Sequence, residues 1–304
     1  MVQNVAPLMA ELEPEDCYLL SGIEHGMRFS KWVDRARLPE FSGLDRDEVA
    51  YRLDRCADRA LIERKTIQYE GYRLRFEGYD ILALRAFSER GTLESVGAPL
   101  GEGKESDVYE AKGDGLVAVK FHREGVTNFR EVRRDRDYTA DRAHTSWMYT
   151  ARVAAEREFE ALTELYGSAA VPEPIDHNRH AIVMERVDGV ELSRAAIPDE
   201  SVPPLLRAIL DEIAAVTSLG YVHSDMSQYN IFVTEDGPVI FDWPQYIAFD
   251  HPNARELLRR DVENVLQFFF RKFPHLREQF PDLEAACEIV LPEHPPSTSS
   301  KSNK

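Results

Sequence analysis

Three side chains in one short stretch of the sequence have the types and spacing that phosphoryl transfer requires. The stretch reads HSDMSQYNIFVTEDGPVIFDWPQ and runs from His223 to Gln245. Asp225 is followed five residues later by Asn230 and a further twelve residues later by Asp242. In this chemistry one Asp orients or deprotonates the acceptor, while an Asn and a second Asp hold Mg²⁺ against the nucleotide phosphates. The stretch therefore predicts a catalytic Asp225 and a metal site at Asn230 and Asp242.

A glycine-containing loop upstream has the residue types that hold nucleotide phosphates. It lies in GAPLGEGKESDVYEAKGDGLVAVKFH, which reads as three β-like runs broken by glycines. Gly101 and Gly103 let the backbone approach a phosphate closely, since neither carries a Cβ, and Lys104 and Ser106 add a charge and a hydroxyl. A lone GxG is more often a tight turn, but Lys120 ends the apolar run VAVK and needs an anionic partner there. The loop and the lysine together predict a phosphate-binding site.

The anionic partner of Lys120 is expected on the next helix. The segment ARVAAEREFEALTELYG predicts a helix whose apolar residues lie roughly on one side. Glu158 lies beside that apolar face, where its carboxylate would reach the lysine. Glu156 is the second choice, and an ordinary surface glutamate is the alternative for either residue.

The adenine of a bound nucleotide would meet the segment VPEPIDHNRHAIVMERVDG. This segment predicts a turn bounded by prolines and then a buried strand that ends at Met184. In an ATP site the backbone of Glu185 to Val187 would contact the adenine edge, with Met184 behind it. An ordinary core strand followed by a turn would give the same pattern without a ligand, so both interpretations fit the segment by itself.

Composition describes an acidic globular protein. Hydrophobic residues make up 43% of the chain, and 37 Lys and Arg stand against 54 Asp and Glu, a net charge of −17. Such a surface repels phosphate backbones, so nucleic-acid binding requires a local basic patch. The excess of acids resembles proteins of salt-accumulating archaea, where high ionic strength screens self-repulsion. The three cysteines lack CxxC spacing, and neither a signal peptide nor a long apolar run is present, which indicates a cytoplasmic protein without membrane contact.

The first part of the chain predicts helices and a two-stranded hairpin. Helices are expected over 13–27, over 32–38, from 42 onward and over 79–90. Between the last two, LIERKTIQY and YRLRF alternate as two strands joined at Glu70 and Gly71. Three helices followed by a two-stranded wing is a winged-helix arrangement.

Winged helices usually bind nucleic acid, but this one is not basic. Residues 1–97 carry 14 Lys and Arg against 18 Asp and Glu. Eight cations could still gather on one face of the third helix and the wing: Arg46, Arg52, Arg55, Arg59, Arg64, Lys65, Arg73 and Arg75. The alternative is a solvated helix face in a domain that docks proteins or its own neighbour, and the fold alone does not decide between them.

The rest of the chain is divided by polar segments. Small residues around 92–97 mark a domain boundary, and the polar, Arg-rich segment 122–149 predicts a flexible or partner-ordered loop, with a solvated linker as the alternative. Its arginines include Arg123, Arg130, Arg133, Arg134 and Arg136. Helices are expected over 202–219, after Gln245 and up to about 291, before a Pro/Ser-rich tail that is expected to be disordered.

These motifs together resemble one known family. GEGKESDVY, VAVK, the REFEAL helix, NRHAIVMERVDG, HSDMSQYN and FDWPQ closely resemble the RIO family of atypical protein kinases. The GKESDVY loop and the N-terminal winged helix point to its second subfamily. The resemblance implies an α+β fold, with a winged helix over 1–91, a trimmed two-lobed kinase domain over 92–291 and a tail over 292–304. The lobes would cover about 92–187 and 188–291.

The resemblance also implies an activity and its site. It implies ATP hydrolysis and Ser/Thr phosphorylation that depend on Mg²⁺, with Mn²⁺ as an alternative metal. Lys120 would hold the α/β-phosphates, Glu158 would orient it, Asp225 would be catalytic, and Asp242 would be a metal ligand and a transient phosphate acceptor. The implied partner is a precursor of the small ribosomal subunit, with its RNA and proteins, and the winged helix would contact RNA or protein.

The sequence differs from ordinary protein kinases at several positions, and these differences bear on the expected activity. Asp242-Trp243-Pro244 replaces Asp-Phe-Gly, and Pro244 stiffens a segment that usually flips. No Ala-Pro-Glu-like segment follows, so the lobe that grips peptide substrates is largely missing, which favours a conformational ATPase. Ser224 replaces the more usual Gly or Arg without an evident consequence. The alternatives are a small-molecule phosphotransferase of the aminoglycoside or choline kinase type and a nucleotide-sensing regulator that binds nucleic acid.

Overall fold

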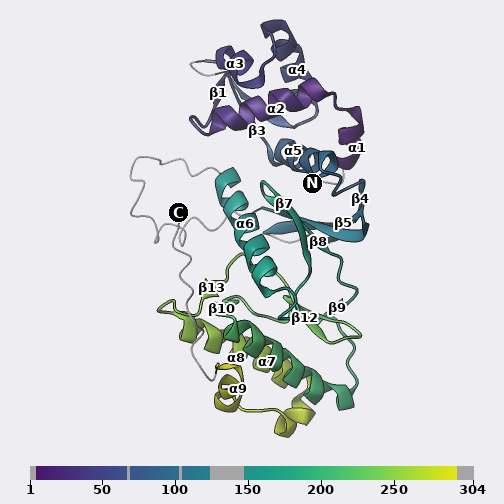
Figure 1. Cartoon of the computed structure of the whole chain (residues 1–304), viewed down its shortest axis with the longest axis vertical. Helices are drawn as coiled ribbons and strands as arrows, with labels where there is room; N and C mark the ends of the chain where they lie inside the picture. The colour runs from purple at the N-terminus through teal and green to yellow at the C-terminus, as the bar shows by residue number, and fades with distance from the viewer. Residues whose placement is uncertain (1–4, 67–68, 103–104, 124–146, 293–304) are drawn as a thin grey trace. The chain divides into compact units, whose positions relative to one another are not determined.

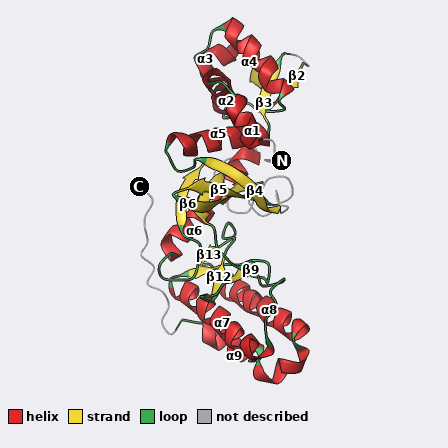
Figure 2. Cartoon of the chain, turned by 90° about the vertical axis from the view of Figure 1, so that its right-hand side faces the viewer, coloured by secondary structure: helices red, strands yellow, loops and turns green. Residues whose placement is uncertain are grey.

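The computed structural model describes residues 5–66, 69–102, 105–123 and 147–292 (Figure 1). The chain forms two compact units: residues 1–155 with 175–184, and residues 156–174 with 185–304. Both contain helices and strands (Figure 2), as the predicted α+β class requires. Within the described ranges, no helix combines the length and the apolar character needed to cross a bilayer.

The first unit begins with a winged helix. Its helices are α1 (Val5–Glu11), α2 (Pro14–Met27), the 3₁₀ turn η2 (Arg35–Arg37), α3 (Leu38–Ser42), α4 (Arg46–Asp58) and α5 (Phe76–Glu89). Its strands are β1 (Val33–Asp34), β2 (Ile62–Lys65) and β3 (Gly71–Leu74), in the antiparallel order β1-β3-β2. Asp45 caps α4, because its carboxylate accepts from the amides of Asp47 and Glu48. The winged helix expected from the sequence is confirmed.

Two details of this domain differ from the expectation. The segment 32–38 is not one helix, since it forms β1 and η2, and α3 then starts at Leu38 with Pro39 in its first turn. Proline fits there because the first helical amides have no intrahelical partner. The short helix α1 was not expected from the sequence.

The second part of the first unit is a five-stranded sheet in the order β4-β5-β6-β8-β7. Its strands are β4 (Ser95–Glu102), β5 (Ser106–Gly113), β6 (Gly115–His122), β7 (Pro174–Asn178) and β8 (Ala181–Glu185). The first three are the three runs that the glycines separate in the sequence, and they pair as antiparallel neighbours (Figure 2). Buried side chains of the winged helix and of this sheet form one continuous apolar cluster.

A buried ionic network joins the winged helix to this sheet. The Arg123 guanidinium donates to both carboxylate oxygens of Asp80 on α5, at 2.7 and 2.9 Å, and to Asp107 on β5 at 2.8 Å. His180 Nε2 donates to Asp80 Oδ1 at 2.8 Å. Burial lowers the pKa of His180 to about 4. Burial alone would raise the pKa of Asp80, but Arg123 and His180 hold it below its ordinary value.

The second unit contains the rest of α6 (Trp147–Leu165), which starts in the first unit, and a mainly helical region. Its further helices are η3 (Asp199–Ser201), α7 (Val202–Ser218), α8 (Ala254–Lys272), η4 (Pro274–Gln279) and α9 (Leu283–Val290). Its short strands are β9 (Val190–Glu191), β10 (Tyr221–Val222), β11 (Ile231–Val233), β12 (Pro238–Ile240) and β13 (Ile247–Ala248). They form the sheets β12-β11-β9 and β10-β13, and both α7 and α8 contact α9 (Figure 1).

Candidate functional site

A buried carboxylate of α8 holds the loop that carries Asp225. Asp261 is 1% exposed. Its two carboxylate oxygens accept hydrogen bonds from the amides of Ser224 at 2.7 Å and Met226 at 3.0 Å, on either side of Asp225. Burial raises the pKa of Asp261 to about 6, although the two amides favour its charged form. The backbone at Asp225 is therefore fixed from both sides.

The residues next to Asp225 complete this loop. Ser224 adopts a left-handed conformation with φ of 63°, and its hydroxyl donates to the Gln245 carbonyl at 2.5 Å. His223 donates from Nε2 to the Phe241 carbonyl at 3.1 Å, and its Nδ1 accepts from the Asp225 amide at 3.3 Å. The sequence indicated no chemical consequence of Ser224, and the structure gives it a structural one. Its side chain ties the catalytic loop, residues 223–226, to Gln245 at the end of residues 241–245, which we call the metal segment.

Asn230 and Asp225 are in direct contact. The Asn230 side-chain amide donates to the Asp225 carbonyl at 2.8 Å, and Asn230 is 8% exposed. Because the nitrogen is used in this bond, the side-chain oxygen is the atom that remains for a cation. The Asn230 carbonyl accepts from the Phe241 amide at 3.1 Å, so the strand pair β11–β12 brings the metal segment beside Asn230.

Asp242 sits in an uncommon backbone conformation. Its φ is 71°, in the left-handed region that residues with a Cβ rarely adopt. The following residue anchors it, since Trp243 is fully buried, its indole donates to the Ile240 carbonyl at 3.1 Å, and its ring lies 4.6 Å from the His223 ring. Such strained residues gather at functional sites. This uncommon backbone conformation therefore supports a functional role for Asp242.

Glu158 contacts this metal segment. It lies on α6, is 1% exposed, and its Oε1 accepts from the Trp243 amide at 3.3 Å. Glu156, the second choice from the sequence, is exposed. Lys120 belongs to the first unit and Glu158 to the second, so the pairing of these two residues stays a prediction.

The predicted phosphate loop lies at the edge of the five-stranded sheet. Gly101 on β4 pairs with Val108, Ser106 opens β5, and β4 is irregular between Pro99 and Gly101. The position of a Cβ on Gly101 has no atom within 4 Å, so the space above it is open. Gly103 and Lys104 lie outside the described residues.

Lys120 is placed by the sheet as the sequence predicts. It lies on β6 opposite Val108, between the buried residues Val119 and Phe121, and is 3% exposed. A buried ammonium group requires a negatively charged partner. Nucleotide phosphates would be such a partner.

The predicted adenine segment follows β8. Met184 is 9% exposed, Glu185 is exposed and Val187 is partly buried. The Glu185 amide donates to the Glu173 carbonyl at 2.8 Å. This amide is engaged already, so an adenine contact would use the Glu185 carbonyl and the backbone of Val187.

The metal-binding residues suit a cation that the nucleotide helps to hold. Within the described ranges, no group of three or more His, Cys, Asp or Glu side chains could hold a metal ion. Asn230 and Asp242 offer oxygen atoms, the ligands that Mg²⁺ prefers, and Mg²⁺ usually takes only one or two protein ligands beside phosphates and water. Asn230 and Asp242 therefore fit a Mg²⁺ ion whose other ligands are nucleotide phosphates and water.

Sequence reasoning missed Asp261 and part of the Arg-rich segment. Asp261 was detectable as a single acid on the apolar side of its helix, between Leu258 and Val262. Arg123 was assigned to a flexible loop, but Asp80 and Asp107 fix it. Residues 147–149 belong to α6, and residues 124–146, with the remaining arginines of that segment, lie outside the described residues.

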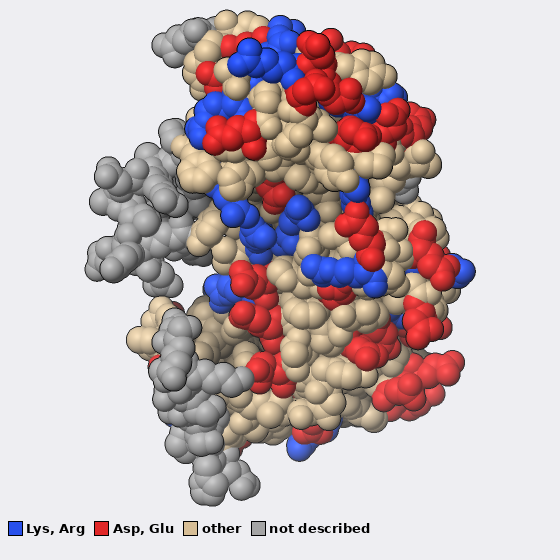
Figure 3. Space-filling view, turned by 45° about the horizontal axis from the view of Figure 1, so that its top comes forward, with Lys and Arg blue, Asp and Glu red and all other residues tan. Residues whose placement is uncertain are grey.

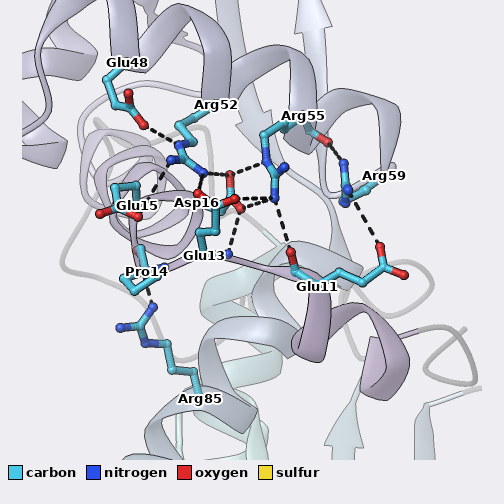
Figure 4. Close-up of polar contacts among 10 residues, drawn as sticks. All are labelled: Glu11, Glu13, Pro14, Glu15, Asp16, Glu48, Arg52, Arg55, Arg59 and Arg85. Atoms are coloured by element: carbon cyan, nitrogen blue, oxygen red, sulfur yellow. Dashed lines mark hydrogen bonds and ion pairs between the residues drawn. The ribbon is translucent and has the colours of Figure 1, made fainter.

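The arginines of α4 do not gather on one exposed cationic face, which was one of the two interpretations that the sequence left open. Arg52 is 6% exposed and contacts Asp16 on α2 at 3.3 Å, Glu13 at 2.7 Å and Glu48 at 2.6 Å (Figure 4). Arg55 also pairs with Asp16, at 3.0 Å. Arg59 lies beside them, with Glu11 at 3.7 Å. These side chains hold α4 against α2, and Figure 3 shows cations and acids interspersed over the N-terminal helices at the top of that view.

Comparison with known families matches most of the chain. The RIO domain family matches residues 107–283, and the family of Rio2 N-terminal domains matches residues 9–90. The RIO-type serine/threonine-protein kinase Rio2 of Methanocaldococcus jannaschii is 42% identical over 250 residues, which cover 80% of this chain and 92% of that protein. The serine/threonine-protein kinase rio2 of Schizosaccharomyces pombe is 37% identical over 281 residues, 90% of this chain and 81% of that protein.

A solved structure is similar over nearly the whole length. It is the Rio2 kinase of Chaetomium thermophilum in an ADP/Mg²⁺-phosphoaspartate complex, with a TM-score of 0.78 and 32% identity. The match covers 95% of this chain and 89% of that one.

Proposed function

The chain belongs to the RIO family of atypical serine/threonine protein kinases, of the Rio2 type, and we propose that it is a Mg²⁺-dependent enzyme that hydrolyses ATP and transfers phosphate at the site around Asp225. The observation that carries this proposal is the fixation of Asp225 by Asp261 and Asn230. A carboxylate carried by a fixed backbone, beside a metal segment with oxygen ligands, is what phosphoryl transfer uses, since positioning and charge stabilisation supply most of its catalysis.

The proposal assigns the steps of this chemistry to particular residues. Lys120 holds the α/β-phosphates and Asp225 orients the acceptor or takes its proton. Asn230 and Asp242 hold Mg²⁺, which neutralises charge on the phosphates when it is bound. Glu158 supports the metal segment through the Trp243 amide and orients Lys120. The phosphate loop with Gly101 and Ser106, and the segment around Met184, bind the nucleotide.

We extend the proposal to a covalent intermediate on Asp242. The solved Chaetomium thermophilum protein is described as a phosphoaspartate complex. In this chain, a carboxylate oxygen of Asp242 would attack the γ-phosphorus of ATP, the bond to the β-phosphate oxygen would break, and ADP would leave. Water would then cleave the aspartyl-phosphate to phosphate and free Asp242. A hydroxylamine-labile phosphate that disappears in Asp242→Asn would support this step.

The test of the enzymatic proposal is ATP turnover in three forms of the full-length chain. Wild type should release phosphate in the presence of Mg²⁺, and chelation of the metal should stop it. Asp225→Ala and Asp242→Ala should each lose at least about a hundredfold in rate, because Asp225 acts on the acceptor and Asp242 on the metal and the reacting phosphate. Equal rates in all three forms would overturn the proposal.

The partner of this activity is proposed to be a precursor of the small ribosomal subunit. The family resemblance supports it, and the trimmed kinase domain expected from the sequence favours an ATPase that works while docked. Co-sedimentation with such precursors, with and without residues 1–90, tests the idea. A full-length protein that stays free at near-native salt would contradict it.

Further proposals concern the source of the protein, its location in the cell and the two alternative functions. The acid-rich composition supports an archaeal, salt-accumulating source, and the three cysteines without CxxC spacing support a cytoplasmic location. The small-molecule phosphotransferase is disfavoured by the Rio2-type N-terminal domain over 9–90. The nucleotide-sensing regulator is disfavoured by the full set of phosphoryl-transfer residues.

A further inference from the structure

One face of the winged-helix sheet is partly exposed to solvent, and this open side carries aromatic and basic side chains. In the register of β2 and β3, Glu63 pairs with Arg73 and Lys65 with Gly71. Because alternate residues of a strand share a face, these four positions lie on the same side. The opposite side is the core side, where Ile62, Tyr72 and Leu74 are buried.

Two aromatic residues meet on the open side above Gly71. A Cβ at Gly71 would lie 2.9 Å from the Tyr69 ring and 3.1 Å from the Trp32 Cβ. The Tyr69 hydroxyl donates to the Trp32 carbonyl at 3.2 Å. Gly71 therefore leaves the room in which Tyr69 and Trp32 come together, and Tyr69 remains 36% exposed.

Each aromatic ring has a cation beside it. The Arg73 guanidinium lies 4.6 Å from the Trp32 ring centre, and Lys65 Nζ lies 5.3 Å from the Tyr69 ring centre. Arg73 also pairs with Glu63 at 2.6 Å, with both side chains partly exposed, and an ion pair of this kind is weak enough to exchange for a phosphate. We call Trp32, Lys65, Tyr69 and Arg73 the wing platform.

The outer face of α4 has the opposite character. Its exposed charged residues are Arg46, Asp47, Asp54 and Asp58, one cation against three acids. The other arginines of α4 are held by acids of α1 and α2 (Figure 4). A helix that enters the major groove of a duplex needs cations toward the phosphates, so α4 is unsuited to that task.

We propose that the wing platform binds an unpaired segment of RNA. Tyr69 and Trp32 would stack on bases, and Lys65 and Arg73 would pair with the phosphates that flank them, the combination that single-stranded nucleic acids require. Stacking needs bases that are free of a duplex, which agrees with the acidic face of α4. This inference deepens the proposed function and rests on it for the choice of RNA.

The experiment measures binding of a fluorescent single-stranded RNA to the full-length chain, beside a hairpin of the same composition, over a range of KCl concentrations. Wild type should bind the single strand more tightly than the hairpin. Tyr69→Leu should weaken binding about fivefold or more, because it removes one stacking surface. Lys65→Gln should reduce the slope of log K against log salt by about 0.7, the value for one phosphate contact to a single strand.

Matched controls lie on α4. Tyr51→Leu removes another exposed tyrosine, which is 53% exposed, and Arg46→Gln removes an exposed cation of the same domain. Both variants should bind as wild type does. A loss in these variants with none at the platform, a preference for the hairpin, or no binding of either RNA would overturn the inference.

ATP turnover of the same variants separates the two proposals. The platform variants should hydrolyse ATP at the wild-type rate without RNA, since they lie outside the proposed catalytic site. Loss of RNA binding with normal turnover concerns the platform alone. Absent turnover in wild type, with RNA binding intact, would concern the enzymatic proposal alone.

Discussion

Asp225 depends on a carboxylate that takes no part in the proposed chemistry. The Asp261 carboxylate on α8 accepts hydrogen bonds from the amides of the two neighbours of Asp225. Asn264, also on α8, donates to the Met226 carbonyl at 3.1 Å. Arg260 also donates to the Ser224 carbonyl. One turn of α8 therefore sets the position of the catalytic loop, and Asp261 is a positioning residue.

Replacement of Asp261 by Asn should lower the rate more than it lowers nucleotide affinity. The new NH₂ group would face a backbone amide that is itself a donor, so one bond is lost, at a cost of about 1.5–3 kcal/mol for a bond to a charged group. We expect kcat to fall about ten- to a hundredfold, with KM for ATP nearly unchanged. Steady-state kinetics with Glu256→Gln, an exposed acid on the same helix, as control measures this. A change in KM alone would contradict the positioning role.

At the residue scale, the sequence predicts a site where spacing reflects chemistry. The interval from Asp225 to Asn230 and Asp242 predicts the phosphoryl-transfer residues, and the structure places Asn230 in contact with Asp225. Asp261 and Arg123 are different, since their partners lie far away in the chain and no local pattern records them. Hydrogen bonds between distant segments appear only once the fold is known.

At the scale of elements, periodicity predicted most helices and strands but not the direction of long polar side chains. The sequence allowed the arginines of α4 to gather on one exposed face. Acids of α1 and α2 instead pair with Arg52, Arg55 and Arg59, and Arg52 becomes one of the most buried cations of the domain. Its long side chain can bury its stem while its guanidinium finds carboxylates, a freedom that a helical pattern does not show.

The network around Arg123 should contribute strongly to the stability of the first unit. Arg123→Gln would leave the buried Asp80 without its main counter-charge, and removal of one partner from a buried pair costs about 3–5 kcal/mol. Arg90→Gln is a suitable control, because Arg90 pairs with Asp176 at 2.7 Å but is 48% exposed, and such pairs contribute at most about 1 kcal/mol. Urea unfolding of both variants measures the difference, and equal midpoints would refute it.

At the scale of the whole molecule, charge is the dominant property. A net charge of −17 repels itself at low ionic strength, and salt shortens the range of that repulsion from about 30 Å at 0.01 M to about 3 Å at 1 M. The same screening weakens exposed ion pairs, but these contribute little individually.

We therefore expect the protein to become more stable as KCl is raised. The melting temperature in molar KCl should exceed that in dilute buffer by several degrees, since about 1 kcal/mol shifts a domain of this size by about 2–4 °C. Thermal unfolding followed by circular dichroism over a KCl series checks this. A maximum at low salt would contradict the expectation and the salt-accumulating source together.

The fully buried Trp243 has a practical consequence for experiments. The chain has three tryptophans, and this one sits next to Asp242 with its indole bonded to the Ile240 carbonyl. An indole in such dry surroundings emits at a shorter wavelength than a hydrated one. Its fluorescence is therefore an intrinsic optical reporter, placed by the fold at the segment where nucleotide and metal would act.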